Sequence, residues 1–262
     1  MVLQTLIIFY GFLTSIGKFG HSNKIVVQMK KYLLLPLLFL FLSCNNTNRT
    51  VIQNQVSPEI KAWEPDIEKF EQLDKSETHP SDAIMFAGSS SIRLWSTLAR
   101  DMKPYPVIQR GYGGAKLSDF AYYAHRIFDP HQCRAFVIFV ANDITGNSDD
   151  KSPVQVDSLC NRVIDIIRSK HPDAPIFWIA TTPTSSRWTV WPEIRKANDL
   201  IKQTCEKRKN TWFIATDFAY LNDQGMPNDS LFRDDRLHLN DRGYAIWTQI
   251  IKDELNKVLV NQ

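Results

Sequence analysis

Cysteine is scarce in this chain, and its few copies lack the spacing of a metal site. The 262 residues include 4 cysteines, with no close Cys pairs of the kind that bind zinc, and no His/Asp cluster has metal-ligand spacing. A strong net charge is also missing, because 31 Lys and Arg oppose 28 Asp and Glu and leave a formal charge of +3. Without a basic stripe, nucleic-acid binding is not expected. We expect no metal site.

Long hydrophobic runs are lacking apart from two near the start. Tyr32 to Leu42 is almost wholly apolar but too short for a comfortable membrane span. It follows the basic Met29-Lys30-Lys31 and precedes Ser43-Cys44 and a polar stretch, which is the order of an export signal. A small residue before a cysteine resembles a bacterial lipoprotein processing site. That resemblance predicts Cys44 as the acylated first residue of the mature protein.

Two features leave alternatives open at this end of the chain. Phe41 stands where the lipoprotein signal usually has leucine, so an ordinary secretory signal with an incidental cysteine is the alternative. A second apolar run, Val2 to Ile16, lacks the same layout, and we expect the true start at Met29. The predicted organisation is an upstream extension (1–28), a lipoprotein-type signal peptide (29–43), a polar tether (44–57) and one globular domain (58–262). We therefore expect an exported protein of the bacterial cell envelope, anchored to a membrane by lipid.

Three cysteines remain within the predicted domain. They are Cys133, Cys160 and Cys205, an odd number that allows at most one disulfide within the chain. None lies in a motif that would favour a reactive thiolate. We expect three buried thiols.

Two hydrophobic periodicities alternate along the domain. Short apolar runs predict strands, and segments with apolar residues at helical spacing separate them. Strands that alternate with helices indicate a parallel sheet covered on both faces, whose ligands bind outside the carboxyl ends of the strands. The predicted strands are 83–87, 106–108, 135–141, 175–180 and 211–215, and the predicted helices are 59–73, 92–102, 117–128, 154–170, 194–208 and 242–258.

A carboxylate and an imidazole stand three residues apart late in the chain, at Asp235 and His238, and a serine-rich turn, 88–91, follows the first predicted strand. A serine hydroxyl becomes a nucleophile when a base takes its proton and a carboxylate orients that base. An Asp and a His at this spacing can share one face of a turn, with Nδ1 toward the carboxylate and Nε2 toward the serine. Asp234 is a competing carboxylate. A serine hydrolase is the hypothesis that these residues favour.

Four blocks of the sequence resemble the Ser, Gly, Asn and His blocks of the SGNH (GDSL-type) hydrolases, in that family's order. They are Phe86-Ala87-Gly88-Ser89-Ser90, Arg110-Gly111-Tyr112-Gly113-Gly114, Val140-Ala141-Asn142-Asp143 and Asp235-Arg236-Leu237-His238. The resemblance implies a flavodoxin-like three-layer α/β/α sandwich with a five-stranded parallel sheet. It also implies ester hydrolysis without a cofactor.

Matched position by position, the resemblance implies Ser90 as the nucleophile, His238 as the base and Asp235 as the residue that orients the base. Ser89 stands where the family usually has Asp, so the choice among Ser89, Ser90 and Ser91 stays open. The implied oxyanion hole consists of the backbone N–H groups of Ser90 and Gly114 and the side-chain amide of Asn142. Such donors usually supply the largest stabilising effect in acyl transfer.

The substrate is less well defined by the sequence. Tyr112, Trp188 and Trp191, with Arg110 and Arg187, fall in or near predicted rim loops, where aromatic faces with polar neighbours suit sugar rings. The alternative is that the tryptophans cover the core. We take Tyr112, Arg187 and Trp188 as the candidate substrate-binding residues.

No long apolar lid segment is visible, which favours an esterase for short acyl groups, with O-acetyl groups of carbohydrates as one candidate substrate. The expected partners are therefore a small-molecule or glycan ester and, through the lipid anchor, a membrane. A non-catalytic carbohydrate- or envelope-binding lipoprotein on the same fold is the alternative function, and Ser89 in place of Asp is its one hint.

Overall fold

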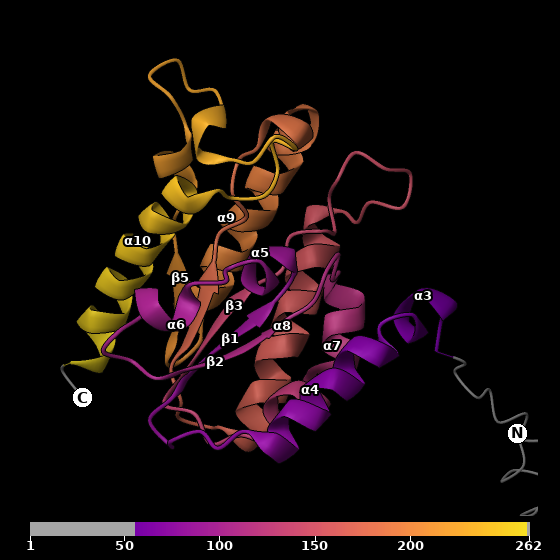
Figure 1. Ribbon diagram of the computed structural model, residues 1–262. Coiled ribbons are helices and arrows are strands. Elements are labelled where there is room, and N and C mark those ends of the chain that lie inside the picture. The colour runs from indigo at the N-terminus through magenta and orange to yellow at the C-terminus, as the bar shows by residue number, and fades with distance from the viewer. Residues whose placement is uncertain (1–55, 261–262) are drawn as a thin grey trace, which may run out of the picture. The chain divides into compact units, whose positions relative to one another are not determined.

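A five-stranded parallel β-sheet forms the centre of the domain in the computed structural model, which describes residues 56–260 (Figure 1). The strands lie side by side in the order β2-β1-β3-β4-β5, and each neighbouring pair is parallel. The predicted signal peptide, Cys44 and most of the predicted tether lie outside the described residues. The strands are β1 (Ile84–Gly88), β2 (Val107–Gly111), β3 (Ala135–Phe139), β4 (Ile176–Ile179) and β5 (Thr211–Ile214).

Helices connect the strands and cover both faces of the sheet. Helices α4, α7, α8 and α9 pack on one face, and α5, α6 and α10 pack on the other (Figure 1). Three-layer packing of this kind is the predicted α/β/α sandwich, and the fold class is confirmed. The helices are α3 (Pro58–Lys61), α4 (Glu64–Ser76), α5 (Ser90–Arg93), α6 (Leu98–Asp101), α7 (Leu117–Phe128), α8 (Pro153–Lys170), α9 (Trp191–Lys207) and α10 (Asp241–Leu259), with short 3-10 turns η2 (Ser185–Val190), η3 (Asp217–Tyr220) and η4 (Asp229–Leu231).

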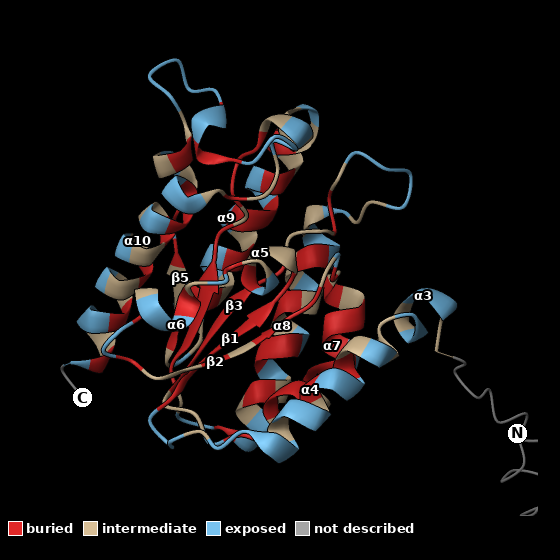
Figure 2. Ribbon diagram, in the orientation of Figure 1, coloured by how far each residue is buried: buried red, intermediate tan, exposed pale blue. Residues whose placement is uncertain are grey.

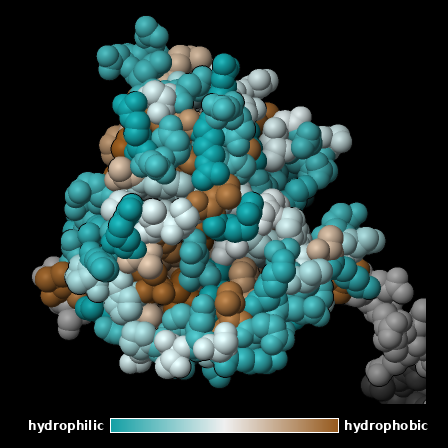
Figure 3. Space-filling model, viewed as in Figure 1, coloured by the Kyte–Doolittle hydropathy of each residue, from teal (hydrophilic) through white to brown (hydrophobic). Residues whose placement is uncertain are grey.

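Successive residues of each strand point to opposite faces of the sheet and so supply two separate cores. In β1, Met85 and Ala87 pack toward the side of α7 and α8, whereas Ile84 and Phe86 pack toward α10. Burial of both faces explains why the strands are continuous apolar runs instead of alternating ones (Figure 2). On the outer face shown in Figure 3, hydrophilic side chains predominate and hydrophobic ones form small patches between them.

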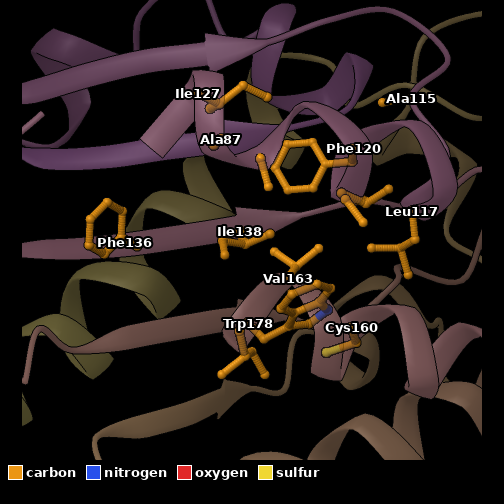
Figure 4. Packing of buried hydrophobic residues seen from close by; sticks show 14 of the residues in the cluster. Ala87, Ala115, Leu117, Phe120, Ile127, Phe136, Ile138, Cys160, Val163 and Trp178 are labelled. Carbon is orange, nitrogen blue, oxygen red and sulfur yellow. The ribbon is translucent and has the colours of Figure 1, made fainter. Parts of the chain in front are cut away.

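The core on the α7 and α8 side is closely packed where these helices cross β3 and β4. Figure 4 shows Phe120 of α7 and Val163 of α8 on either side of Ile138 of β3, with Trp178 of β4 beside Val163. All four side chains are almost completely buried. Burial of each such side chain stabilises the folded state by roughly 1.5–3 kcal/mol. This layer therefore holds in place the strand ends that carry the site.

Two of the predicted helices are interrupted in the structure. The segment predicted as one helix over 59–73 is split into α3 and α4, with the break at Ala62 and Trp63. Pro65, in the first turn of α4, has no backbone N–H, and its ring would clash with the carbonyl of Lys61 if the helix continued. The short helix predicted over 92–102 is likewise two single turns, α5 and α6.

The order of the strands places one crevice at the centre of the carboxyl edge. In the order 2-1-3-4-5, the connections leave β1 and β3 in opposite directions, and ligands bind where the order reverses. Gly88 at the end of β1 pairs with Phe139 at the end of β3, so the residues that follow these strands emerge side by side. They are the serine turn and the loop of Asn142.

Cys133, Cys160 and Cys205 are free thiols, so no disulfide forms among residues 56–260. Cys160 and Cys205 are buried as predicted, while Cys133 is only partly covered. Burial raises the pKa of Cys133 and of Cys205 to about 12, which holds both as unreactive thiols at neutral pH. Within the described range, none of the helices combines the length and the apolar character of a membrane span.

Candidate active site

The serine turn is pressed tightly against the neighbouring strand. Gly88 has φ +141°, and a Cβ on this residue would lie 1.9 Å from the carbonyl oxygen of Phe139. Only glycine permits this approach, which lets the N–H of Ser89 donate to the Phe139 carbonyl at 2.8 Å. Helix α5 then begins at once with Ser90. The strand therefore ends in a sharp turn that presents Ser90 at the crevice.

The structure brings one of the three candidate serines to the histidine. The Oγ of Ser90 lies 2.9 Å from Nε2 of His238, a residue 148 positions later in the chain. Ser89 is buried, and the carbonyl of Ser91 accepts a hydrogen bond from the Tyr244 hydroxyl at 2.8 Å. Neither of these serines contacts the ring of His238 in the described part of the chain. The geometry therefore favours Ser90 among the three hydroxyls.

His238 is held on its other side by Asp235. The Oδ2 of Asp235 lies 2.7 Å from Nδ1 of His238, whereas Oδ1 accepts the backbone N–H groups of Leu237 and His238, both at 2.9 Å. Arg236, between them, has φ +52°, a left-handed conformation that turns the chain back on itself. Asp234 makes no contact with the ring among the residues described. The competing carboxylate is thus placed away from the histidine.

A closed loop fixes the position of this turn. An isolated antiparallel bridge joins Phe232 to Leu239, and the N–H of Arg233 donates to the carbonyl of His238 at 2.8 Å. Asn240 follows immediately and caps α10, where its Oδ1 accepts the N–H groups of Arg242 and Gly243. The imidazole is therefore anchored between a bridge and a helix terminus, which limits its movement relative to Ser90.

The carboxylate of Asp235 remains ionised to unusually low pH. Its partial burial would raise the pKa, but the hydrogen bonds from the His238 ring and from the backbone N–H groups of His238 and Leu237 outweigh this and lower the pKa below its usual value. The side chain is 47% exposed, against 23% for His238. Because solvent reaches the carboxylate, these hydrogen bonds fix its orientation more than burial does.

Two of the three implied oxyanion donors, the Ser90 N–H and the Asn142 amide, border the crevice. The backbone N–H groups of Ser90 and Gly114 have no acceptor among the described residues. The Nδ2 of Asn142 donates one of its two hydrogens to the Ala115 carbonyl at 2.9 Å, which leaves a second N–H. These are the groups implied as the oxyanion hole.

A pocket opens beside Ser90 and contains about 380 Å³ of empty space, part of which is open to solvent. Ser90, Asn142 and His238 all line it. Gly114 does not line it and instead lines a separate pocket with Trp63, whose ring would lie 3.3 Å from a Cβ on Gly114. The pocket lining is Ser89, Ser90, Ser91, Phe139, Ala141, Asn142, Thr181, Thr182, Thr184, Arg187, Leu237, His238 and Leu239.

The prediction that Tyr112 binds substrate is wrong. Tyr112 has no exposed surface, packs in the core against Trp63 and Phe120, and donates its hydroxyl to Asp119 at 2.6 Å. It follows the last residue of β2, so its ring enters the layer beneath the crevice. Arg110 is also buried, in an ion pair with Asp74.

Arg187 and Trp188 have different environments although they are neighbours. Arg187 lines the pocket. Trp188 does not line it, and its ring stacks on that of Trp191 with centroids 6.2 Å apart while packing on the core. For these two tryptophans, the observed packing corresponds to the core-covering alternative.

Two pocket residues, Thr182 and Thr184, were missed by the sequence analysis. Both hydroxyls are buried and have no hydrogen-bond partner among residues 56–260. They follow β4, and the rule that polar residues collect at carboxyl strand ends would have found them. No group of three or more His, Cys, Asp and Glu side chains suited to a metal ion occurs in the described residues.

The fold is a three-layer α/β/α sandwich with a crevice at the carboxyl edge of its sheet. A family profile for the GDSL-like lipase/acylhydrolase family matches residues 82–246, which is more than half of the chain. The chain therefore belongs to this family and is an ester-hydrolysing enzyme. Family membership decides against the non-catalytic alternative. No curated protein matches the chain in sequence.

Solved structures of several hydrolases share the fold. A Streptococcus pneumonia protein, provisionally described as a platelet activating factor, is 17% identical with a TM-score of 0.65 over 89% of this chain and 100% of its own. A GDSL-like lipase from Bacteroides thetaiotaomicron is 14% identical (TM-score 0.62; 74% and 98% of the two chains). A carbohydrate esterase family 3 protein from Talaromyces cellulolyticus is also 14% identical (TM-score 0.54; 69% and 99%). At these identities the likeness shows the fold.

Proposed function

We propose that this protein is a serine esterase for short-chain acyl esters, with Ser90 as nucleophile, His238 as general base and Asp235 as the group that orients the base. The observation that carries the proposal is the position of the His238 ring, 2.9 Å from the Ser90 hydroxyl and 2.7 Å from the Asp235 carboxylate. A hydroxyl becomes strongly nucleophilic when such a base removes its proton.

The reaction proceeds in two halves. Nε2 of His238 takes the proton of Ser90 as Oγ attacks the ester carbonyl, and the carbonyl oxygen becomes an oxyanion. The N–H groups of Ser90, Gly114 and Asn142 stabilise that charge. His238 then gives its proton to the departing alcohol, which leaves an acyl group on Ser90. Water, deprotonated by His238, attacks this acyl group, and the carboxylic acid departs as the proton returns to Ser90.

The size of the pocket supports a short acyl group. Apart from the space that is open to solvent, its cavity volume is only about 20 Å³, which suits a small acyl group better than a long fatty chain. Its lining includes several threonine and serine side chains in addition to the apolar Phe139 and Leu237. Exposed large hydrophobic side chains are few and scattered among the described residues, which does not suit a lipid-binding lid. O-acetyl groups of carbohydrates are the substrate that we propose within this class.

Hydrolysis of p-nitrophenyl acetate, butyrate and octanoate by the full-length protein tests the proposal. We expect a preference for the two shorter esters and a loss of kcat on the order of 10³-fold or more in Ser90→Ala and His238→Ala. Ser91→Ala is the matched control and should keep most of the activity. Full activity in Ser90→Ala would refute the assigned nucleophile. Release of acetate from acetylated xylan and chitin oligomers then tests the carbohydrate substrate.

We also propose that the enzyme is exported and anchored to a membrane of the bacterial envelope through lipid on Cys44. The supporting feature is the signal-like segment that ends at Ser43-Cys44. Expressed in a bacterial host, the protein should take up radiolabelled palmitate and fractionate with membranes, whereas Cys44→Ser should lose the label. Palmitate uptake that persists in Cys44→Ser would contradict this site of acylation.

A further inference from the structure

Arg187 lies in η2, a segment to which the proposed mechanism assigns no role. Its guanidinium donates through Nη2 to Oδ1 of Asn142 at 2.7 Å and through Nη1 to the carbonyl of Ala141. Both acceptors belong to the loop that follows β3. One side chain from η2 therefore holds the backbone and the side chain of this loop together.

The charge of Arg187 has no partner of opposite sign. No carboxylate lies within ion-pair distance of its guanidinium anywhere in the described structure, unlike Arg110 and Arg126, which both form ion pairs. Burial lowers the pKa of Arg187 below its ordinary value, and the more distant Asp150 and Asp143 oppose this only in part. An unpaired cation that is partly buried is unfavourable for folding. Its presence beside the crevice therefore points to a role in the reaction.

The two contacts of Asn142 define which way its amide faces. Arg187 can only donate, so it requires the oxygen of the amide on its side, and the Ala115 carbonyl can only accept, so it requires the nitrogen on the other. A flipped amide would place two donors against each other. This orientation leaves the second N–H of Nδ2 for the crevice. In the flipped amide, the oxygen would take the place of that nitrogen.

The cation also makes that N–H a stronger donor. A hydrogen bond from a guanidinium to the amide oxygen draws electron density from the nitrogen, and the effect is larger in a site of low dielectric constant. The oxyanion that forms during ester hydrolysis would therefore be stabilised through the amide by a charge that does not itself touch it.

We infer that Arg187 is a positioning residue that orients and polarises the Asn142 amide for the oxyanion, instead of binding the substrate directly. The inference rests on the proposed serine mechanism. It predicts that Arg187→Ala lowers kcat for p-nitrophenyl acetate by about 10²-fold, as loss of one oxyanion donor does, with little change in KM. An arginine that binds substrate would chiefly raise KM.

A double-mutant cycle with Asn142 gives the decisive measurement. If Arg187 acts through the amide, Arg187→Ala/Asn142→Ala should be no slower than Asn142→Ala alone. Millimolar guanidinium chloride should restore part of the kcat of Arg187→Ala, which has space for the ion, and should restore none in the double variant. Arg195→Met, at an exposed position without a described partner, is the matched control and should behave as wild type.

Several results would overturn the inference. One is that the losses of kcat from Arg187→Ala and Asn142→Ala multiply in the double variant. Another is that guanidinium restores kcat even without Asn142. A third is that Arg187→Ala changes KM alone. Thermal unfolding identifies variants that do not fold, and if Arg187→Ala is among them the cycle is run with Arg187→Met, which keeps the apolar stem of the side chain but removes the charge and the donors. Labelling of Ser90 by a fluorophosphonate in the wild type separates the two proposals. Unlabelled, inactive wild type refutes the serine mechanism, whereas labelled, active wild type with multiplicative effects refutes the role of Arg187 alone.

Discussion

Asp235 and Asp234 are neighbours in the sequence but differ in their contact with His238. Both are exposed carboxylates next to each other in the sequence, yet only Asp235 accepts the N–H groups of Leu237 and His238 and contacts the ring. The left-handed turn at Arg236 produces this selection, because it returns the chain toward Asp235. The three-residue spacing predicted the contact between Asp235 and His238. The left-handed turn at Arg236 has no clear signal in the sequence.

Alanine substitution at each carboxylate should therefore give very different enzymes. We expect Asp235→Ala to lower kcat on the order of 10³-fold, because the imidazole loses the group that fixes its tautomer. Asp234→Ala should retain activity within about twofold, since its side chain makes no described contact with the site. Steady-state kinetics on p-nitrophenyl butyrate measures both. A comparable loss in Asp234→Ala would show that the assignment of the carboxylate is wrong.

At the scale of single elements, the junction of β1 and α5 depends on the absence of one side chain. Gly88→Ala would place a Cβ within 1.9 Å of the Phe139 carbonyl, so β1 and β3 would have to separate. We expect a loss of stability on the order of 3 kcal/mol or more. Gly113→Ala is the control, because a Cβ there would meet only the end of the Arg93 side chain at 3.4 Å, and we expect a change within about 1 kcal/mol. Urea unfolding measures both, and equal stabilities would contradict the tight approach of the strands.

The start of α7 contains a second element-scale feature, a buried carboxylate. Asp119 accepts the Tyr112 hydroxyl at 2.6 Å and the N–H of Lys116 at 3.0 Å. Burial raises its pKa to about 6 from 3.8, an increase that these hydrogen bonds reduce and the nearby charge of Asp143 reinforces. The folded state therefore holds a proton on Asp119 over a pH range in which the unfolded chain has lost it.

Stability should consequently fall as the pH rises through this range. Because the pKa of Asp119 is higher in the folded state than in the unfolded chain, the loss of stability is absent below about pH 4. It is complete above about pH 6, where the free energy of unfolding is lower by roughly 3 kcal/mol. Asp119→Asn removes this titration, so the advantage of wild type over the variant should be largest at pH 4 and smallest at pH 7. Urea unfolding across this range tests it. A constant difference between the two proteins would contradict the raised pKa.

At the scale of the whole molecule, the fold was predictable because its signals are local. Apolar runs and helical spacing lie within short windows, and the four motif blocks fix their order along the chain. The exceptions are instructive in physical terms. Pro65 signals the break between α3 and α4, but the apolar spacing over 59–73 favoured a single helix. The burial of Tyr112 depends on the side of the sheet to which its loop turns, and the sequence does not specify that side.

The contacts within the site were harder to predict from the sequence than the fold. Arg187 and Asn142 are 45 residues apart, and nothing in either motif specifies that a guanidinium will meet that amide. The same is true of the place of Gly114 beside Trp63, which lies in the turn between α3 and α4, outside the matched family region. Pairings of this kind arise when distant segments pack, so composition and spacing do not contain them.

The distance of 148 residues between Ser90 and His238 also has a consequence for synthesis. The ribosome completes the proposed nucleophile and the three proposed oxyanion donors long before it adds the proposed base, which comes after the last strand. A nascent chain that ends before residue 232 carries an idle serine, so premature termination yields an inert product instead of a poorly controlled esterase. Catalytic activity in this protein would thus report that translation has passed the final strand and that the segment after β1 has met the segment before α10.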